Sequence, residues 1–176
     1  MDVLLEHYHR FFHGRATDTI ELEFDGVELT LLSFVYPYWP GRRVLASFDL
    51  SLMPARVECI HVFPEGAPDV IETFGATLLF ALRNSCMKRD VLIRFGVETQ
   101  FVASTGKSAA FLTVPYSVPD LEEFHVVTGT NIRVLEAFVV TDAEADYVET
   151  SGVDAFEKIA SDTGADLTDF GRPSLV

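Results

Sequence analysis

The four residues Thr141-Asp-Ala-Glu144 constrain the fold of this chain most, because they mark where a helix must begin. The Thr141 hydroxyl can accept a hydrogen bond from the backbone N–H of Glu144, while the Glu144 carboxylate can accept one from the N–H of Thr141. Residues 134–140, directly before this capping box, form an apolar run typical of a strand. We therefore expect a strand that passes directly into a helix.

A second helix is expected after Gly152, because glycine readily adopts the backbone conformations that end a helix. The segment 154–161 carries Phe156 and Ile159 at a spacing that buries both on one face. We therefore expect residues 132–163 to fold as strand, helix and helix, with the acidic side chains of the helices exposed.

The rest of the chain alternates short apolar segments with turn residues, which is typical of a protein rich in strands. The apolar spacing predicts an amphipathic N-terminal helix over 2–13 and a further helix over 69–84. A hairpin is expected around Asp25-Gly26, since this pair favours a tight turn. Other strands are expected at 43–50, 56–63, 91–95, 100–103, 109–114 and 124–128.

These elements predict a single α+β domain over residues 1–176. With 176 residues, of which 48% are hydrophobic, the chain can bury a core of ordinary size, and no change in composition indicates a linker. We expect a mostly antiparallel, twisted mixed sheet packed against helices. The 69–84 helix and the two C-terminal helices are expected on the same side of this sheet.

The chain is strongly acidic, with 27 acidic and 13 basic residues and a formal net charge of −14. Residues 132–176 contain ten acidic and three basic residues, so half of the negative excess lies in the last quarter of the chain. Such a surface repels phosphate, which argues against nucleic acid as a partner, and it favours a basic protein. In the alternative interpretation, the acidity serves only solubility.

Three features favour a cytoplasmic protein. The first residues, Met1-Asp-Val-Leu-Leu-Glu-His7, lack the basic segment and the long apolar segment of a signal peptide. No apolar run approaches the roughly 20 residues of a membrane-spanning helix, so no membrane is expected as a partner. Cys59 and Cys86 do not have the spacing of a metal or redox motif, and free thiols are typical of a reducing compartment.

No metal site, cofactor site or catalytic residue is predicted. His9 and His13 would share a helix face, but no carboxylate or cysteine completes a set of metal ligands. The sequence Ser104-Thr-Gly-Lys-Ser108 ends like a phosphate-binding P-loop, yet Phe101 stands where that motif requires a glycine. The pair Glu122-Glu123 would point to opposite faces of a strand, so it does not form a catalytic dyad.

The segment Tyr36-Pro-Tyr-Trp-Pro-Gly-Arg-Arg43 is the best candidate for a binding site. Its two prolines and its glycine end the preceding strand, so its aromatic side chains lie on a loop. Trp, Tyr and Arg dominate interface hot spots because they cover a large area with few torsions and keep a polar group. The candidate protein-binding residues are Tyr36, Tyr38, Trp39, Arg42 and Arg43. In the alternative interpretation, Trp39 folds back and caps the core.

Two stretches of the sequence resemble the Suppressor of fused (SUFU) family. In the closing segment, a strand is followed by Thr-Asp-Ala-Glu144, a glycine break and the ending Arg172-Pro-Ser174. The second stretch is Leu45 to Pro54 followed by Glu58-Cys-Ile-His-Val-Phe-Pro64, although the family usually has glycine where Asp49 stands. The resemblance implies a non-catalytic protein-binding domain. Animal members hold an extended peptide of a transcription factor, and bacterial members often occur as immunity proteins beside secreted toxins.

The sequence therefore predicts a non-catalytic protein-binding module of the immunity or antitoxin type. Such a module would bind a toxin or another protein partner in a groove or by strand addition. The alternative is a small, hydrolase-like enzyme that uses convergent acidic residues, which a deep pocket with two carboxylates of raised pKa would favour. We also expect Arg172 to form an ion pair with an acidic residue of its own domain.

Overall fold

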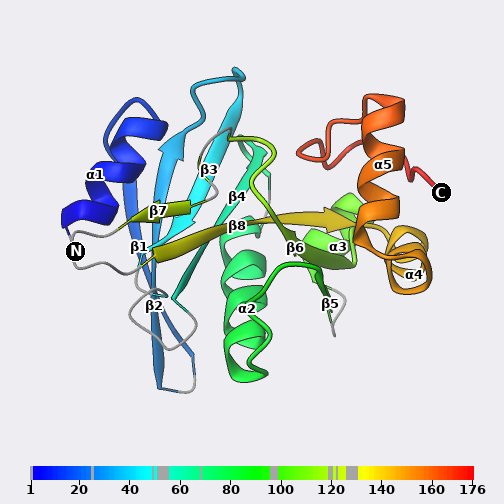
Figure 1. Cartoon of the computed structure of the whole chain (residues 1–176), viewed down its shortest axis with the longest axis horizontal. Helices are drawn as coiled ribbons and strands as arrows, with labels where there is room; N and C mark the ends of the chain where they lie inside the picture. The colour runs from blue at the N-terminus through cyan, green and yellow to red at the C-terminus, as the bar shows by residue number, and fades with distance from the viewer. Residues whose placement is uncertain are drawn as a thin grey trace.

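A mixed β-sheet runs through the centre of the molecule, with helices on both of its faces (Figure 1). The strand order is β1-β2-β3-β4-β8-β6-β5, and β7 pairs with β8. Strands β4 and β8 are parallel, whereas the other described pairs are antiparallel. The predicted α+β fold, a mostly antiparallel, twisted mixed sheet packed against helices, is confirmed. The strands are β1 (Asp18–Phe24), β2 (Val27–Val35), β3 (Arg42–Ser47), β4 (Val57–Pro64), β5 (Val91–Arg94), β6 (Ala109–Thr113), β7 (Glu123–His125) and β8 (Asn131–Val140).

The computed structural model describes residues 2–24, 26–48, 50, 56–67, 69–95, 99–118, 121, 123–125 and 131–176. Parts of several sequence expectations lie outside these residues. They are Asp25 of the predicted turn, Asp49 and the 51–54 connection in the second SUFU-like stretch, Glu122 with the side chain of Glu123, and 126–128 of the last predicted strand.

The described residues form the helices α1 (Asp2–Phe11), α2 (Val70–Arg83), α3 (Gln100–Thr105), α4 (Asp142–Ser151) and α5 (Val153–Thr163). The segment 100–103, which the sequence predicted as a strand, lies in α3. Thr99 caps this helix by accepting a hydrogen bond from the Val102 N–H at 3.2 Å, and Gly106, with a φ of 66°, ends it. These local hydrogen bonds outweigh the strand preference of a short apolar run.

Strand β8 determines which helix covers which face of the sheet, because its side chains alternate between the two faces. Leu135 and Val139 share a core with α2 and α3. Val134 shares a core with α1, whereas Phe138 and Val140 pack against α4 and α5. The C-terminal helices therefore lie on the opposite face from α2, and the expectation that they share one side was wrong. A strand that is apolar on both faces needs cover on both.

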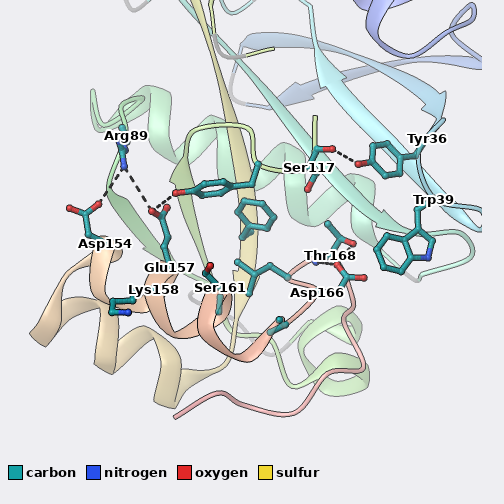
Figure 2. Close-up of a pocket in the computed structure, with 16 residues that line it drawn as sticks. Tyr36, Trp39, Arg89, Ser117, Asp154, Glu157, Lys158, Ser161, Asp166 and Thr168 are labelled. Carbon is teal, nitrogen blue, oxygen red and sulfur yellow. Dashed lines mark hydrogen bonds and ion pairs between the residues drawn. The ribbon is translucent and has the colours of Figure 1, made fainter. Parts of the chain in front are cut away.

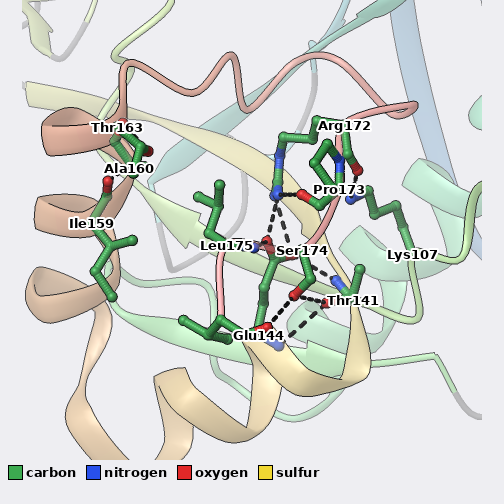
Figure 3. Close-up of polar contacts among 11 residues, drawn as sticks. Lys107, Thr141, Glu144, Ile159, Ala160, Thr163, Arg172, Pro173, Ser174 and Leu175 are labelled. Carbon is green, nitrogen blue, oxygen red and sulfur yellow. Dashed lines mark hydrogen bonds and ion pairs between the residues drawn. The ribbon is translucent and has the colours of Figure 1, made fainter.

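The C-terminal segment is held by a buried cluster around Glu144, which we call the Glu144 clamp (Figure 3). The Arg172 guanidinium donates to both carboxylate oxygens of Glu144, from Nη1 and, at 3.2 Å, from Nη2. The backbone N–H of Thr141 donates to Oε2 at 2.9 Å, and that of Leu175 donates to Oε1 at 3.0 Å. Lys107, which is 1% exposed, donates from Nζ to the Arg172 carbonyl at 3.2 Å.

The clamp confirms the predicted capping box and the expected ion pair of Arg172. Glu144 itself is 0% exposed, so the expectation that the helix acids are exposed was wrong for this residue. The side chains of Asp142 and Asp146 are exposed as expected. Burial alone would raise the pKa of Glu144, but the hydrogen bonds from Arg172 and Thr141 outweigh burial and lower it.

Phe170 anchors the same C-terminal segment in the core on the α2 side of the sheet. Its ring lies 5.6 Å from that of His61 in a stacked arrangement and 5.3 Å from that of Phe101 edge-on. His61 Nδ1 lies 2.8 Å from the Ala137 carbonyl oxygen and donates to it, and burial lowers the pKa of His61 to about 4. Residues 164–168 are therefore held between the end of α5 and a fixed anchor.

Candidate functional site

A groove with a volume of about 890 Å³ lies between α5 with residues 164–168 and the loops that follow β2 and β6 (Figure 2). Figure 2 shows that different kinds of side chain gather at its two ends. The end that we call aromatic contains Tyr36, Trp39, Ser117, Asp166 and Thr168, and the end that we call charged contains Arg89, Asp154, Glu157 and Lys158.

Trp39 forms the exposed rim of the aromatic end. It lies on the turn between β2 and β3, which the Tyr36 N–H closes by donating to the Arg42 carbonyl at 3.1 Å. The Trp39 residue is 56% exposed, so it does not cap the core. Tyr36 is only 8% exposed, and its hydroxyl donates to the Ser117 carbonyl. Tyr36 therefore connects the two loops, while Trp39 presents its ring to solvent.

Asp166 places a negative charge at the aromatic end. Its Oδ1 accepts hydrogen bonds from the N–H and the hydroxyl of Thr168 at 2.9 and 2.6 Å, and its Oδ2 accepts one from Arg42 at 2.9 Å. Burial alone would raise the pKa of Asp166, but the hydrogen bonds from Thr168 and Arg42 outweigh burial and lower it. Asp166 is therefore an anion at neutral pH.

Glu136 lies buried behind the aromatic end, next to Phe138 on the same face of β8, and it is 0% exposed. Its Oε2 accepts a hydrogen bond from the Ser117 N–H at 3.0 Å, whereas Oε1 has no partner among the described residues. Burial raises the pKa of Glu136 to about 7, although hydrogen bonds from Ser117 and Tyr116 oppose the rise. A buried carboxyl group with a perturbed pKa beside a groove is a candidate functional residue.

Contacts at the charged end cross-link the two walls of the groove. Glu157 of α5 accepts hydrogen bonds from the hydroxyl groups of Thr113 at 2.6 Å and Tyr116 at 2.5 Å. Arg89 lies 3.4 Å from a carboxylate oxygen of Asp154 and 3.9 Å from one of Glu157. The charges of these side chains are therefore largely matched within the protein.

Three of the five predicted binding residues lie at the groove. Tyr36 and Trp39 line it, and Arg42 reaches it through its ion pair with Asp166. The other two, Tyr38 and Arg43, do not line the groove. The Tyr38 ring packs against that of His13 near the end of α1, and Arg43 donates to the Ser33 hydroxyl at 2.7 Å on the other side of β3.

Sequence reasoning missed Glu136, Glu157 and Asp166. Glu136 carries a signal that could have found it, because it is the one acidic residue within the apolar run 134–140. Such a position is buried whichever face the strand turns to the core. Glu157 and Asp166 have no comparable signal, since only the fold brings them opposite the β2 and β6 loops.

Other candidate chemistry does not coincide with the groove. Among the described residues, no group of three or more His, Cys, Asp or Glu side chains could hold a metal ion. No described helix combines the length and the apolar character needed to cross a membrane. The exposed acids of α4 face Arg94 instead, which lies 2.6 Å from Asp146 and 3.0 Å from Glu149.

Several solved structures share this fold at low sequence identity. A SUFU (suppressor of fused protein) homologue from Neisseria gonorrhoeae matches with a TM-score of 0.77 and 16% identity, over 99% of this chain and 96% of that one. A chain of the Sufu–Fu complex matches with a TM-score of 0.70 and 13% identity, over 99% and 91%. Drosophila Suppressor of Fused matches with a TM-score of 0.69 and 13% identity over 98% of this chain, which spans 50% of that protein's length. No curated protein matches the sequence.

The sequence profile of the Suppressor of fused protein (SUFU) family matches residues 56–173, which is more than half of the chain. The match begins just before β4 and includes Glu136, Glu144 and Arg172, whereas the aromatic rim at Trp39 lies outside it. The resemblance seen in the closing segment of the sequence is thereby confirmed. This chain belongs to the Suppressor of fused family.

Proposed function

We propose that residues 1–176 act as one SUFU-like domain that binds a protein partner, without catalysis, through the groove and its aromatic rim. The observation that carries this proposal is the exposure of two aromatic residues at the groove, 56% for Trp39 and 52% for Tyr116. Large aromatic side chains that face solvent beside a groove are typical of interface hot spots.

The partner that we propose is a toxin-type protein, with this chain as its cytoplasmic immunity protein. The net charge of −14 favours a basic partner, because complementary charges speed encounter and disfavour other partners. Both cysteines are free thiols, which fits a reducing compartment. One of the structural relatives is the Sufu–Fu complex, which is a complex between proteins.

The groove suits binding better than hydrolysis. A hydrolase-like site would need a carboxyl group with a raised pKa and an ionised carboxylate that both reach the substrate. Asp166 is ionised, but Glu136, whose pKa is raised, is 0% exposed and does not line the groove, so it does not reach a substrate there. Strand addition at β1 or β5, the two ends of the sheet order, is a second mode of binding, but among the side chains that the structure describes neither edge carries a comparable exposed aromatic rim.

The test is co-expression of this chain with the protein encoded by the gene next to its own. We expect the two proteins to co-purify, and we expect this chain to restore growth when its partner is toxic. Trp39→Ala should weaken the complex by about 30-fold, because a hot-spot aromatic residue contributes roughly 2 kcal/mol or more. Phe80→Ala is the matched control, since Phe80 is 50% exposed on α2, on the opposite face of the sheet from α5.

Failure of co-purification together with failure to restore growth would contradict the proposal. If the complex forms but Trp39→Ala and Phe80→Ala weaken it equally, the result would support protein binding and would exclude the groove as the binding site.

A further inference from the structure

The aromatic end of the groove contains more acidic than basic groups. The carboxyl group of Asp166 lies there and that of Glu136 lies buried behind it, and Arg42 is the cation that pairs with Asp166. Arg42 donates to Asp166, and no ion pair joins Glu136 to a basic side chain among the described residues, where its Oε1 also has no hydrogen-bond partner. The cations Arg89 and Lys158 lie at the other end of the groove (Figure 2).

We propose that the aromatic end receives an arginine or lysine side chain of the protein partner, an inference that rests on the function proposed above. The cation would lie against the ring of Trp39, in front of Ser117, and opposite the carboxyl groups of Asp166 and Glu136. Trp39 is the residue type that holds a cation best on its ring face. An apolar side chain would bury the same rings, but it would leave Glu136 without a counter-charge.

Glu136 acts on this cation from behind the groove wall. Ser117 separates its carboxyl group from the groove. The Ser117 N–H donates a hydrogen bond to Glu136, and the Ser117 carbonyl accepts one from the Tyr36 hydroxyl. Charges interact more strongly through the protein interior than through water, so a buried carboxylate can attract a cation that it does not touch. Glu136 therefore contributes to the selection of a cationic side chain of the partner.

Binding of a cation should release a proton from Glu136. Burial raises the pKa of Glu136 to about 7, so the group is partly protonated at neutral pH, and a nearby cation favours the ionised form. The titratable groups around Glu136 are Tyr36 after β2, Cys59 from β4, Tyr116 after β6 and Asp166 after α5. Burial raises the pKa of Tyr36 to about 12 and also raises the pKa values of Cys59 and Tyr116, whereas the pKa of Asp166 is lowered. Glu136 is therefore the one of these groups that titrates near neutrality.

The fluorescence of Trp39 reports on this site directly, because Trp39 is the only tryptophan in the chain. The probe is the tripeptide acetyl-Gly-Arg-Gly-amide, and its control is the same peptide with citrulline, which has nearly the same shape and no charge. We expect a saturable fluorescence change with the arginine peptide and a much weaker response with citrulline. The apparent affinity for arginine should rise about tenfold from pH 6 to pH 8, in proportion to the ionised fraction of Glu136.

Glu136→Gln separates this inference from a general effect of negative charge. The variant should bind the arginine peptide at least about tenfold more weakly at pH 8 and should lose the pH dependence. The control Glu149→Gln, on the exposed face of α4, should leave both unchanged. Equal binding of the two peptides to the wild type overturns the inference without using any variant. Binding of the neighbouring gene's product despite that result would leave the proposed function intact, whereas arginine binding with no protein partner would count against the function alone.

Discussion

Two buried glutamates on either side of the end of β8 have opposite roles. Glu136 and Glu144 are each 0% exposed. Glu144 accepts hydrogen bonds from the Arg172 guanidinium and from two backbone N–H groups, so both of its oxygens are satisfied. Glu136 accepts from Ser117 through one oxygen, and its other oxygen has no partner among the described residues. The paired glutamate stabilises the fold, whereas the unpaired one costs stability, which fits the role in partner binding that we propose for Glu136.

The difference between the two glutamates should appear as opposite dependences of stability on pH. The pKa of Glu144 is lowered in the folded state, so its contribution to stability is present above its unfolded pKa and is lost as the pH falls. The pKa of Glu136 is raised from 4.5 to about 7, so the folded state holds the proton more tightly. Stability should therefore fall as the pH rises through this range and should level off above it.

The largest effect is expected when the Glu144 clamp is broken. Arg172→Ala leaves Glu144 buried without its paired guanidinium, and the removal of one partner from a buried ion pair typically costs about 3–5 kcal/mol. The measurement is the free energy of unfolding from urea denaturation at pH 7. Arg94→Ala is the control, because Arg94 pairs with exposed acids on α4 and such surface pairs contribute roughly 0–1 kcal/mol. Similar losses in the two variants would show that the clamp does not hold the C-terminal segment.

The next effect should have the opposite sign. Glu136→Gln removes a buried charge, so it should stabilise the protein at pH 8 by up to about 3 kcal/mol, the equivalent of the pKa shift from 4.5 to about 7. At pH 4 the carboxyl group is mostly protonated in both states, and the gain should nearly disappear. Urea denaturation at several pH values measures this difference. A variant that is less stable than the wild type at pH 8 would show that Glu136 is structural, as Glu144 is.

A smaller loss is expected at the helix start within the clamp. Thr141→Ala removes the hydroxyl that accepts the Glu144 N–H at 3.3 Å, but it keeps the Thr141 N–H that donates to the Glu144 carboxylate. Loss of an N-cap side chain typically costs about 1 kcal/mol. Thermal unfolding of Thr141→Ala beside Thr141→Ser, which keeps the hydroxyl, measures the contribution of this cap. An equal loss in both variants would assign the effect to packing instead.

The same two glutamates show what could be predicted from the sequence. The capping box is local, because its two hydrogen bonds join residues three apart, and it was predicted in full. For Arg172 an acidic partner was expected, but only the fold identifies Glu144. The role of Glu136 depends on the parallel pairing of β4 with β8 and on the Ser117 loop, which are non-local contacts that no sequence period encodes. The C-terminal helices were expected on the same face of the sheet as α2 for the same reason, since the sequence does not encode which face each helix covers.

The smallest effect on stability is expected at the rim of the groove. Trp39 is 56% exposed, and Trp39→Ala keeps the hydrogen bond from the Tyr36 hydroxyl to the Ser117 carbonyl. The free energy of unfolding should therefore change by no more than about 0.5 kcal/mol. Tyr36→Phe, which removes that hydrogen bond, should cost roughly 1 kcal/mol. Urea denaturation of both variants therefore separates the residue that holds the groove together from the residue that faces a partner. A loss of several kcal/mol for Trp39→Ala would make its ring part of the core, and the groove would then lose its exposed rim.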